Sequence, residues 1–156
     1  MPDLIIKPGG SAASSGGEIE TPFNCESTWF CCGNAWGPCG STGHGACGTC
    51  NSGSLQCAWP NLSDACFSIT RPDRCGRTSL LRHGCGHTFT ITSRCNSNSV
   101  NVKIADCGPQ SDLFCGEQDC CSNGLCAKDR LMDLTPAAFS RLASLSAGKI
   151  AVQVAS

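Results

Sequence analysis

Apolar and polar residues alternate most clearly in the second half of the chain, where they predict three β-strands. Apolar side chains take alternate positions within residues 88–94 and 99–106, and the same spacing returns in residues 148–154. Successive side chains of a strand point to opposite faces, so this spacing gives each segment one face suited to a core. We therefore expect three half-buried strands in this part of the chain.

A short helix is expected between the last two of these strands. Thr135 is a suitable N-cap, Pro136 suits the first helical position, and Phe139 lies on an apolar helical face. Gly148 is able to end the helix in a left-handed conformation. These signals predict a helix over residues 136–146.

Two further segments are predicted to be irregular. Residues 25–77 are dominated by Gly, Ser, Asn, Pro and Cys, with a short strand expected only at residues 27–30. Residues 107–130 carry five cysteines and are expected to form a long loop held by disulfides. Regular structure is therefore expected mainly beyond residue 85.

The composition divides the chain into a tail and one domain. Residues 1–23 have the Gly- and Ser-rich composition of a flexible linker, and residues 24–156 are expected to form the domain. Leu, Ile and Ile at residues 4–6 are the apolar part of the tail. They are a candidate for self-association at a sheet edge of a neighbouring subunit, with a disordered terminus as the competing expectation.

Cysteine is the most unusual feature of the composition. The chain has 16 cysteines in 156 residues but 6% aromatics and no tyrosine, so a thin core is expected to be reinforced by disulfides. Disulfides persist in oxidising compartments, which indicates an extracellular or secreted protein, although the first residues do not form a signal peptide. The alternative is a zinc site at Cys47 and Cys50, but no second pair with that spacing follows, and we expect neither metal nor cofactor.

Charge balance and the length of the apolar segments each exclude one class of partner. Eleven basic and twelve acidic residues give a net charge of −1, without the basic surface of a nucleic-acid-binding protein. A local cluster of arginines is a candidate for an anionic partner, with a solvated surface as the simpler interpretation; it comprises Arg71, Arg74, Arg77 and Arg82. No apolar segment reaches the length of a membrane helix, so no membrane insertion is expected.

Two carboxylates follow or precede regular elements and form a candidate site. Asp106 comes at the end of the predicted strand 99–106, and Asp133 lies just before the predicted helix. Paired carboxylates are the usual groups for proton transfer at a glycosidic oxygen. The competing interpretations are structural: Asp133 as a helix cap, and Asp106 as the start of a turn before Gly108.

The order of several motifs resembles the barrel domain of expansins and its relatives in barwin, rare lipoprotein A and barwin-like endoglucanases. An Asp-x-x-Pro motif is followed by Asp-Leu-Thr, and Thr-Trp-Phe is similar to the Thr-Trp-Tyr of expansins. Gly-Ala-Cys-Gly and a Cys-Gly segment with alternating Phe and Ile also agree. These motifs lie at residues 106–109, 133–135, 28–30, 45–48 and 85–95.

The resemblance spans roughly residues 25–154 and implies a mainly β fold. That fold is a six-stranded double-psi β-barrel with a short helix and long disulfide-pinned loops. It also implies that Asp133 is the essential acid, Asp106 its companion at a groove, and Thr28 a polar neighbour. Nothing in the chain corresponds to the second, cellulose-binding domain of expansins.

Departures from the family pattern change the expected activity. The endoglucanase relatives carry a base near the first strand, where this chain has Phe30, so efficient hydrolysis of cellulose is not expected. The histidine of rare lipoprotein A aligns with Leu80. His83 and His87 lie nearby, but surface or core histidines are the commoner interpretation.

Three functions remain open from the sequence. The first is an expansin-like module that binds cell-wall polysaccharide and loosens or remodels it, with Trp29, Trp36 and Trp59 as further sugar-binding residues. The second is a barwin-like defence protein, lectin or protease inhibitor that binds through its disulfide loops. The third is an extracellular structural subunit that assembles through its tail. Tryptophans exposed along a groove favour the first function, and buried tryptophans beside protruding loops favour the second.

Overall fold

The computed structural model describes residues 22–63, 75, 80–120 and 126–156. The predicted tail contact at residues 4–6 lies outside this part of the chain, as do Arg71, Arg74 and Arg77. Among the described residues, no helix is long and apolar enough to cross a membrane.

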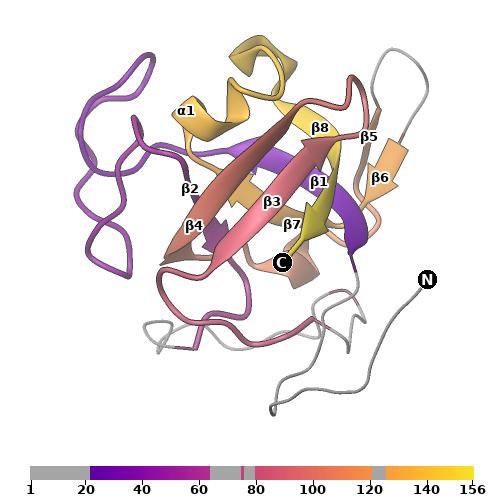
Figure 1. Cartoon of the computed structure of the whole chain (residues 1–156), viewed down its shortest axis with the longest axis horizontal. Helices are drawn as coiled ribbons and strands as arrows, with labels where there is room; N and C mark the ends of the chain where they lie inside the picture. The colour runs from indigo at the N-terminus through magenta and orange to yellow at the C-terminus, as the bar shows by residue number, and fades with distance from the viewer. Residues whose placement is uncertain (1–21, 64–74, 76–79, 121–125) are drawn as a thin grey trace.

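Six strands close into a barrel with a small two-stranded hairpin beside it (Figure 1). The barrel order is β1-β7-β2-β4-β3-β8, in which β1 pairs with β7 and β2 with β4 in parallel and the other neighbours are antiparallel. The barrel strands are β1 (Phe23–Trp29), β2 (Gln56–Trp59), β3 (Thr88–Ser93), β4 (Ser99–Cys107), β7 (Arg130–Leu134) and β8 (Lys149–Ala155). The six-stranded barrel expected from the family resemblance is therefore confirmed.

The alternating segments became barrel strands for the predicted reason. Val100, Val102 and Ile104 of β4 are buried while the intervening residues are exposed. In β8, Ile150, Val152 and Val154 are buried, as is Ala151 between the first two. The apolar faces of β3, β4 and β8 meet inside the barrel, around the large buried rings of Trp59, Phe89 and Phe139. All three predicted strands are found within about one residue of their expected bounds.

Regular structure is more extensive than the sequence indicated. β2 lies within the segment predicted to be loop, and β1 is longer than the strand expected at residues 27–30. The cysteine-rich segment 107–130 also holds a hairpin, β5 (Gln118–Cys120) and β6 (Cys126–Lys128), and the first residue of β7. The prediction of one long loop there is wrong, because strands of three to five residues leave too short a pattern to detect.

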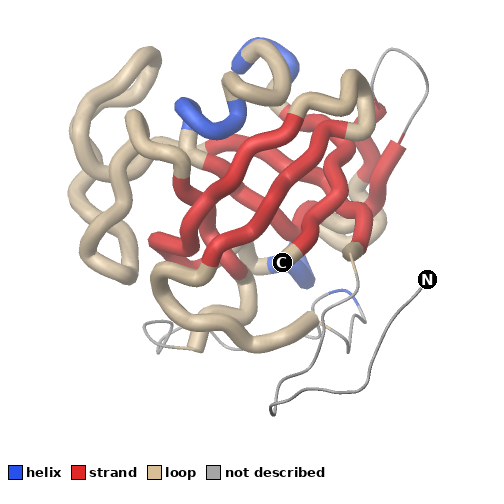
Figure 2. Tube along the Cα trace, viewed as in Figure 1, coloured by secondary structure: helices blue, strands red, loops and turns tan. Residues whose placement is uncertain are grey.

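The helix is shorter than predicted. α1 covers Pro136–Phe139, and a separate 3₁₀ turn follows at Leu145–Ala147. Between them Ser144 has an extended backbone, with ψ of 142°, which ends the helical path. Thr135 takes the N-cap position, but its hydroxyl bonds the carbonyls of Ser54 and Gln56 and makes no capping bond. Figure 2 shows these two helical pieces against one end of the barrel.

Disulfides hold the loops outside the barrel. Four are defined: Cys31–Cys39, Cys32–Cys50, Cys47–Cys85 and Cys75–Cys115. Cys95 and Cys107 are disulfide-bonded as well. Cys47 and Cys50, the pair considered for zinc, are therefore joined to two different partners, which uses both sulfurs. Cys57 is a buried thiol in the core and is an exception to the expected pairing.

Candidate functional site

The two predicted acids lie in one row across neighbouring barrel strands. Thr28 of β1 pairs with Asp133 of β7, Asp133 pairs with Ala58 of β2, and Ala58 pairs with Asp106 of β4. Residues directly opposite each other in paired strands project to the same face of a sheet. Two strand spacings separate the backbones of Asp133 and Asp106, roughly 10 Å. We call Thr28, Asp133, Ala58 and Asp106 the acidic row.

Asp133 is the more perturbed acid of the row. Its carboxylate is half-buried, and Oδ1 accepts a hydrogen bond from the Thr28 hydroxyl. Burial raises the pKa of Asp133 above its ordinary value, and the Thr28 bond and Arg130 partly oppose that shift while Asp106 adds to it. The cap interpretation does not hold, because Asp133 belongs to β7 and Thr135 takes the N-cap position.

Asp106 makes its structural contacts through one carboxylate oxygen, and its other oxygen has no hydrogen bond from the described residues. Its Oδ1 accepts hydrogen bonds from the backbone N–H groups of Ala46 and Cys107, both at 2.8 Å. The bond to Cys107 is local, whereas the bond to Ala46 reaches a loop 60 residues away in the chain. One carboxylate oxygen therefore fixes that loop beside the row.

The loop at residues 42–48 approaches β4 so closely that it requires a glycine. A Cβ placed on Gly45 would lie 2.8 Å from the Ala105 carbonyl oxygen and 2.8 Å from Asp106 Cγ. The Cys47 N–H also donates to the Ala105 oxygen, at 3.1 Å. Gly45 thus permits the contact between the loop and the acid, a role that its position in a sequence motif did not reveal.

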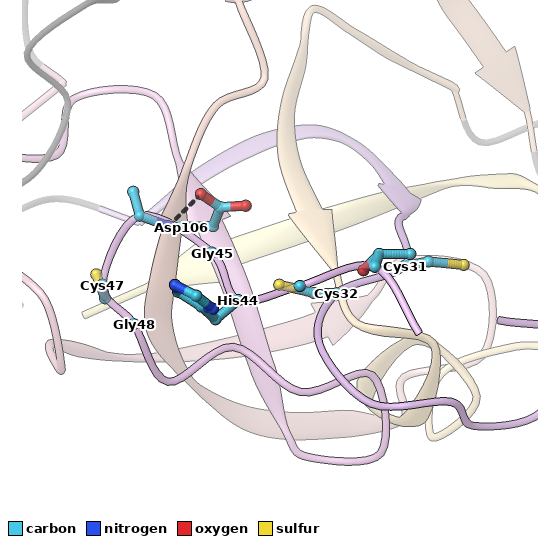
Figure 3. A pocket seen from close by; sticks show the side chains of 10 residues that line it. Cys31, Cys32, His44, Gly45, Cys47, Gly48 and Asp106 are labelled. Carbon is cyan, nitrogen blue, oxygen red and sulfur yellow. Dashed lines mark hydrogen bonds between the residues drawn. The ribbon is translucent and has the colours of Figure 1, made fainter. Parts of the chain in front are cut away.

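An open pocket of about 690 Å³ lies next to Asp106 (Figure 3). Its walls are backbone, small side chains and disulfide sulfur, with His44 as the largest polar side chain; the lining comprises Cys31, Cys32, residues 42–48 and Asp106. Cys32, Cys50 and Asp106 bring possible ligand atoms within 4.8 Å of one another. Because Cys32 and Cys50 form a disulfide, neither provides a thiolate to a metal.

The three tryptophans do not share one groove. Trp59 is 0% exposed in the core, with its indole N–H donated to Leu81, so the prediction that it binds sugar is wrong. Trp29 is half-buried, and its indole N–H donates to Leu145 at 3.0 Å. Trp36 is 38% exposed on the loop closed by the Cys31–Cys39 disulfide. The three tryptophans therefore differ in solvent exposure, and the sequence alone could not tell which of them is able to contact a sugar.

The two candidate histidines pack against the core. His83 and His87 stack with ring centroids 3.8 Å apart, and both contact the ring of Phe89. Burial, followed by the neighbouring His83, lowers the pKa of His87. Leu80, at the position of the transglycosylase histidine, is buried. Both histidines are half-buried and serve in packing, which agrees with the interpretation of surface or core histidines.

Comparison with known families identifies the fold. The sequence profile of a double-psi β-barrel family described as lytic transglycolase matches residues 60–154, more than half of the chain. The chain belongs to this family. No curated protein sequence matches the chain significantly.

Solved structures similar to this lytic transglycolase family member include a protease inhibitor and an expansin. The Streptomyces papain inhibitor SPI is 20% identical with a TM-score of 0.46, over 88% of this chain and 94% of that one. An apo expansin of Clavibacter michiganensis is 17% identical with a TM-score of 0.47, over 86% of this chain. A variant of that expansin in complex with cellohexaose is 17% identical with a TM-score of 0.46. The chain spans 49% of the expansin length.

Replacing Gly45 by Ala is expected to destabilise the double-psi barrel by about 1–3 kcal/mol, because the new methyl overlaps the Ala105 carbonyl and Asp106. That corresponds to roughly 2–4 °C in melting temperature per kcal/mol. Gly40→Ala is the matched control, since a Cβ there meets nothing within 4 Å. Thermal melts of the two variants measure the difference. Equal melting temperatures would show that the loop yields to the methyl without cost.

Proposed function

We propose that this chain is an expansin-like module that binds cell-wall polysaccharide along the acidic row and loosens or remodels it. The observation that carries the proposal is the Thr28–Asp133 hydrogen bond in one row with Asp106. The open pocket beside Asp106 extends this surface away from the row. The disulfides support an extracellular location, where such a polysaccharide is found.

The chemistry proposed for the row is proton donation to a glycosidic oxygen. The raised pKa of Asp133 keeps its proton to higher pH than an ordinary aspartate, which suits a general acid. Thr28 fixes the orientation of the carboxyl group through its hydroxyl. Asp106 is a companion charge that raises the pKa of Asp133 and offers its second oxygen to a sugar hydroxyl.

Hydrolysis is not part of the proposal. Phe30 stands where the related endoglucanases carry their base, and it packs with the apolar cluster of Cys32, Cys50 and Ala105. A phenyl ring cannot activate water, so an inverting hydrolysis has no base at this position. Transfer of the sugar to a hydroxyl group balances with a single acid: Asp133 gives its proton to the leaving oxygen as the glycosidic bond breaks, and the resulting carboxylate takes the proton of the hydroxyl that forms the new bond.

The proposal is tested by retention of the protein on insoluble cell-wall polysaccharide, combined with a wall-extension assay and a reducing-sugar assay. We expect retention and extension, with reducing sugar near background. Rapid release of reducing ends from cellulose would contradict the mechanism. Absence of any glycan binding would contradict the function itself.

Thr28→Val is expected to shift the pH dependence of wall extension, so that the loss of activity on the alkaline side occurs at a higher pH. The Thr28 hydroxyl stabilises the ionised carboxylate and lowers the pKa of Asp133, so its removal at nearly constant shape raises that pKa further. Asp133 then retains its proton at a higher pH, while the loss of orientation reduces activity about tenfold or more. NMR titration of Asp133 and the pH profile of wall extension measure the two effects. An alkaline limb shifted to lower pH would contradict the assignment.

A second candidate function is recognition of a protein, such as a protease, by the disulfide-held loop. The specific observation is Trp36, which is 38% exposed and held in a backbone bridge with Cys39 beside the Cys31–Cys39 disulfide. Rigid exposed aromatics are frequent anchors of protein interfaces. Inhibition of a papain-type protease, lost in Trp36→Ala and retained in Asp133→Asn, would favour this function. Glycan binding that is lost in Asp133→Asn and retained in Trp36→Ala would favour the polysaccharide-binding function.

A further inference from the structure

A β-bulge in β7 brings Arg130 onto the face that carries Asp133. The two residues are three positions apart, and side chains with that separation in a regular strand point to opposite faces. In the pairing with β1, however, Glu26 lies opposite Arg130 and Thr28 lies opposite Asp133, so β7 uses three steps where β1 uses two. Glu26 and Thr28 project to one face, and their partners Arg130 and Asp133 therefore share it, with backbones roughly 7 Å apart.

Side-chain contacts agree with this placement of Arg130. Its Nε lies 3.9 Å from Glu117 Oε1, and the other oxygen of Glu117 accepts a hydrogen bond from the Lys149 ammonium. Lys149 pairs with Thr28, whose hydroxyl donates to Asp133. Glu117 therefore lies over the face of the acidic row and contacts Arg130 there.

Two groups hold the Arg130 guanidinium in place. Its central carbon lies 3.4 Å from the centroid of the Phe114 ring, a cation–π contact. Arg130 Nε and Glu117 Oε1 are buried and have no hydrogen-bond partner among the described residues, so they attract each other as two charges partly shielded from water. The segment with Phe114 and Glu117 leads into the β5–β6 hairpin, which packs against β1 and β8 (Figure 1). The position of the guanidinium is thus set by the hairpin as well as by β7.

The charge of Arg130 acts on Asp133. Burial raises the pKa of Asp133, the Thr28 hydrogen bond and the positive charge of Arg130 lower it, and the negative charge of Asp106 raises it. The titratable groups on the elements around Asp133 and Arg130 are Glu26 of β1, Cys57 of β2, Asp106 of β4, Lys149 of β8, and Glu117 and Asp129 before β5 and β7. A charge removed from this surrounding moves the pKa of Asp133 in a direction that depends on its sign.

We propose that Arg130 is a positioning residue that stabilises the carboxylate formed when Asp133 gives up its proton. The bulge brings the guanidinium to this face, and Phe114 and Glu117 hold it there. In the transfer reaction, Asp133 is ionised between the donation of its proton and the uptake of a new one. A partly buried carboxylate is disfavoured unless a positive charge lies near it, and Arg130 supplies that charge. This inference rests on the proposed function and names a further residue of the same site.

The test combines an NMR titration of the Asp133 carboxyl group in the full chain without substrate with the pH dependence of wall extension. Arg130→Gln removes the positive charge, so we expect Asp133 to keep its proton to a higher pH and the alkaline loss of wall extension to follow it. Extension at the optimal pH is expected to fall about tenfold, because the carboxylate loses a stabilising charge. Arg130→Lys keeps the charge and is expected to restore the titration and most of the activity.

Glu117→Gln separates this electrostatic role from a structural one. It removes the negative charge beside Arg130 at nearly constant shape, so the titration of Asp133 is expected to move to lower pH, opposite to the effect of Arg130→Gln. A merely structural ion pair predicts a loss of stability in both variants and no shift of the titration in either. If Arg130→Gln does not fold, the direction of the shift in Glu117→Gln decides. Arg141→Gln is the matched control, because Arg141 is exposed just beyond α1 and outside the row, and the titration should not change.

The outcomes distinguish this inference from the proposed function. An Asp133 titration that stays unchanged in Arg130→Gln and Glu117→Gln, or moves in the same direction in both, would overturn the role of Arg130. Asp133-dependent wall extension by the wild type would then leave the proposed function intact. Opposed shifts in a protein without any glycan binding or wall extension would support the action of Arg130 on Asp133 and overturn the proposed function.

Discussion

Replacing Asp133 by Asn is expected to reduce the wall-directed activity at least about a hundredfold while the protein stays folded. The amide has nearly the shape of the carboxyl group and its oxygen still accepts the Thr28 hydrogen bond. It has no proton of suitable acidity to give to a glycosidic oxygen. Wall extension measures the activity, and circular dichroism measures the fold.

The same substitution is expected to lower activity but to raise the stability of the fold at neutral pH. Because burial raises the pKa of Asp133, the folded protein disfavours the ionised carboxylate. The stability associated with the neutral acid is complete below the ordinary pKa of an aspartate and is lost as pH rises through the raised folded pKa. Asn stays neutral, so Asp133→Asn is expected to melt higher than the wild type at pH 7, with the difference narrowing toward pH 4. A gain in stability with a loss of activity is typical of a functional acid.

Asp129→Asn is the matched control for this prediction. Asp129 has a left-handed backbone, with φ of 69°, and its Oδ1 accepts from the Gly116 N–H. Asn tolerates that conformation and keeps the acceptor oxygen, so neither activity nor stability should change much. An Asp133→Asn variant that retains full activity would remove Asp133 from the mechanism, even if its stability changes as expected.

The sequence predicted β3, β4 and β8, because each of these strands has a long run of alternating apolar and polar residues. β4, with nine residues, alternates over most of its length, and this was sufficient to place it. β2 has four residues and lies among glycines, serines and asparagines. It is held on both sides by partners distant in sequence, β4 and β7, and such pairing leaves no local signal.

In the candidate site, too, the sequence identified the residues with distinctive motifs but not the strand pairings that bring them together. Asp106, Asp133 and Thr28 were named from motifs, but their arrangement depends on Ala58, which pairs with both acids and has no distinctive chemistry. Thr28 joins Asp133 only through the β1–β7 register. Trp59 was named as a sugar-binding residue because the sequence gives its residue type but not its burial, which is complete in the structure. Register and burial are set by the closed barrel as a whole, so a single sequence could not supply them.

Reduction of the disulfides is expected to unfold the domain at room temperature. The four defined bridges close loops with sequence separations of 8, 18, 38 and 40 residues. At about 2–4 kcal/mol for each bridge, they supply together about 8–16 kcal/mol. A domain of this size has a total stability of about 5–15 kcal/mol, so the loss is comparable to the whole. Circular dichroism and thermal melts with and without reductant measure the change.

Cys57 provides the control that assigns this effect to the disulfides. Burial, with a smaller contribution from the charge of Asp133, raises the pKa of the Cys57 thiol, so it should not react with thiol reagents in the native protein. Cys57→Ala should fold in the oxidised state at a cost of about 1 kcal/mol and unfold on reduction like the wild type. Native protein that reacts at once with several equivalents of thiol reagent, or a reduced protein that still melts cooperatively, would contradict the prediction. In that case the core around Trp59 and Phe89 would have to hold the barrel without covalent support, despite its small number of aromatic side chains.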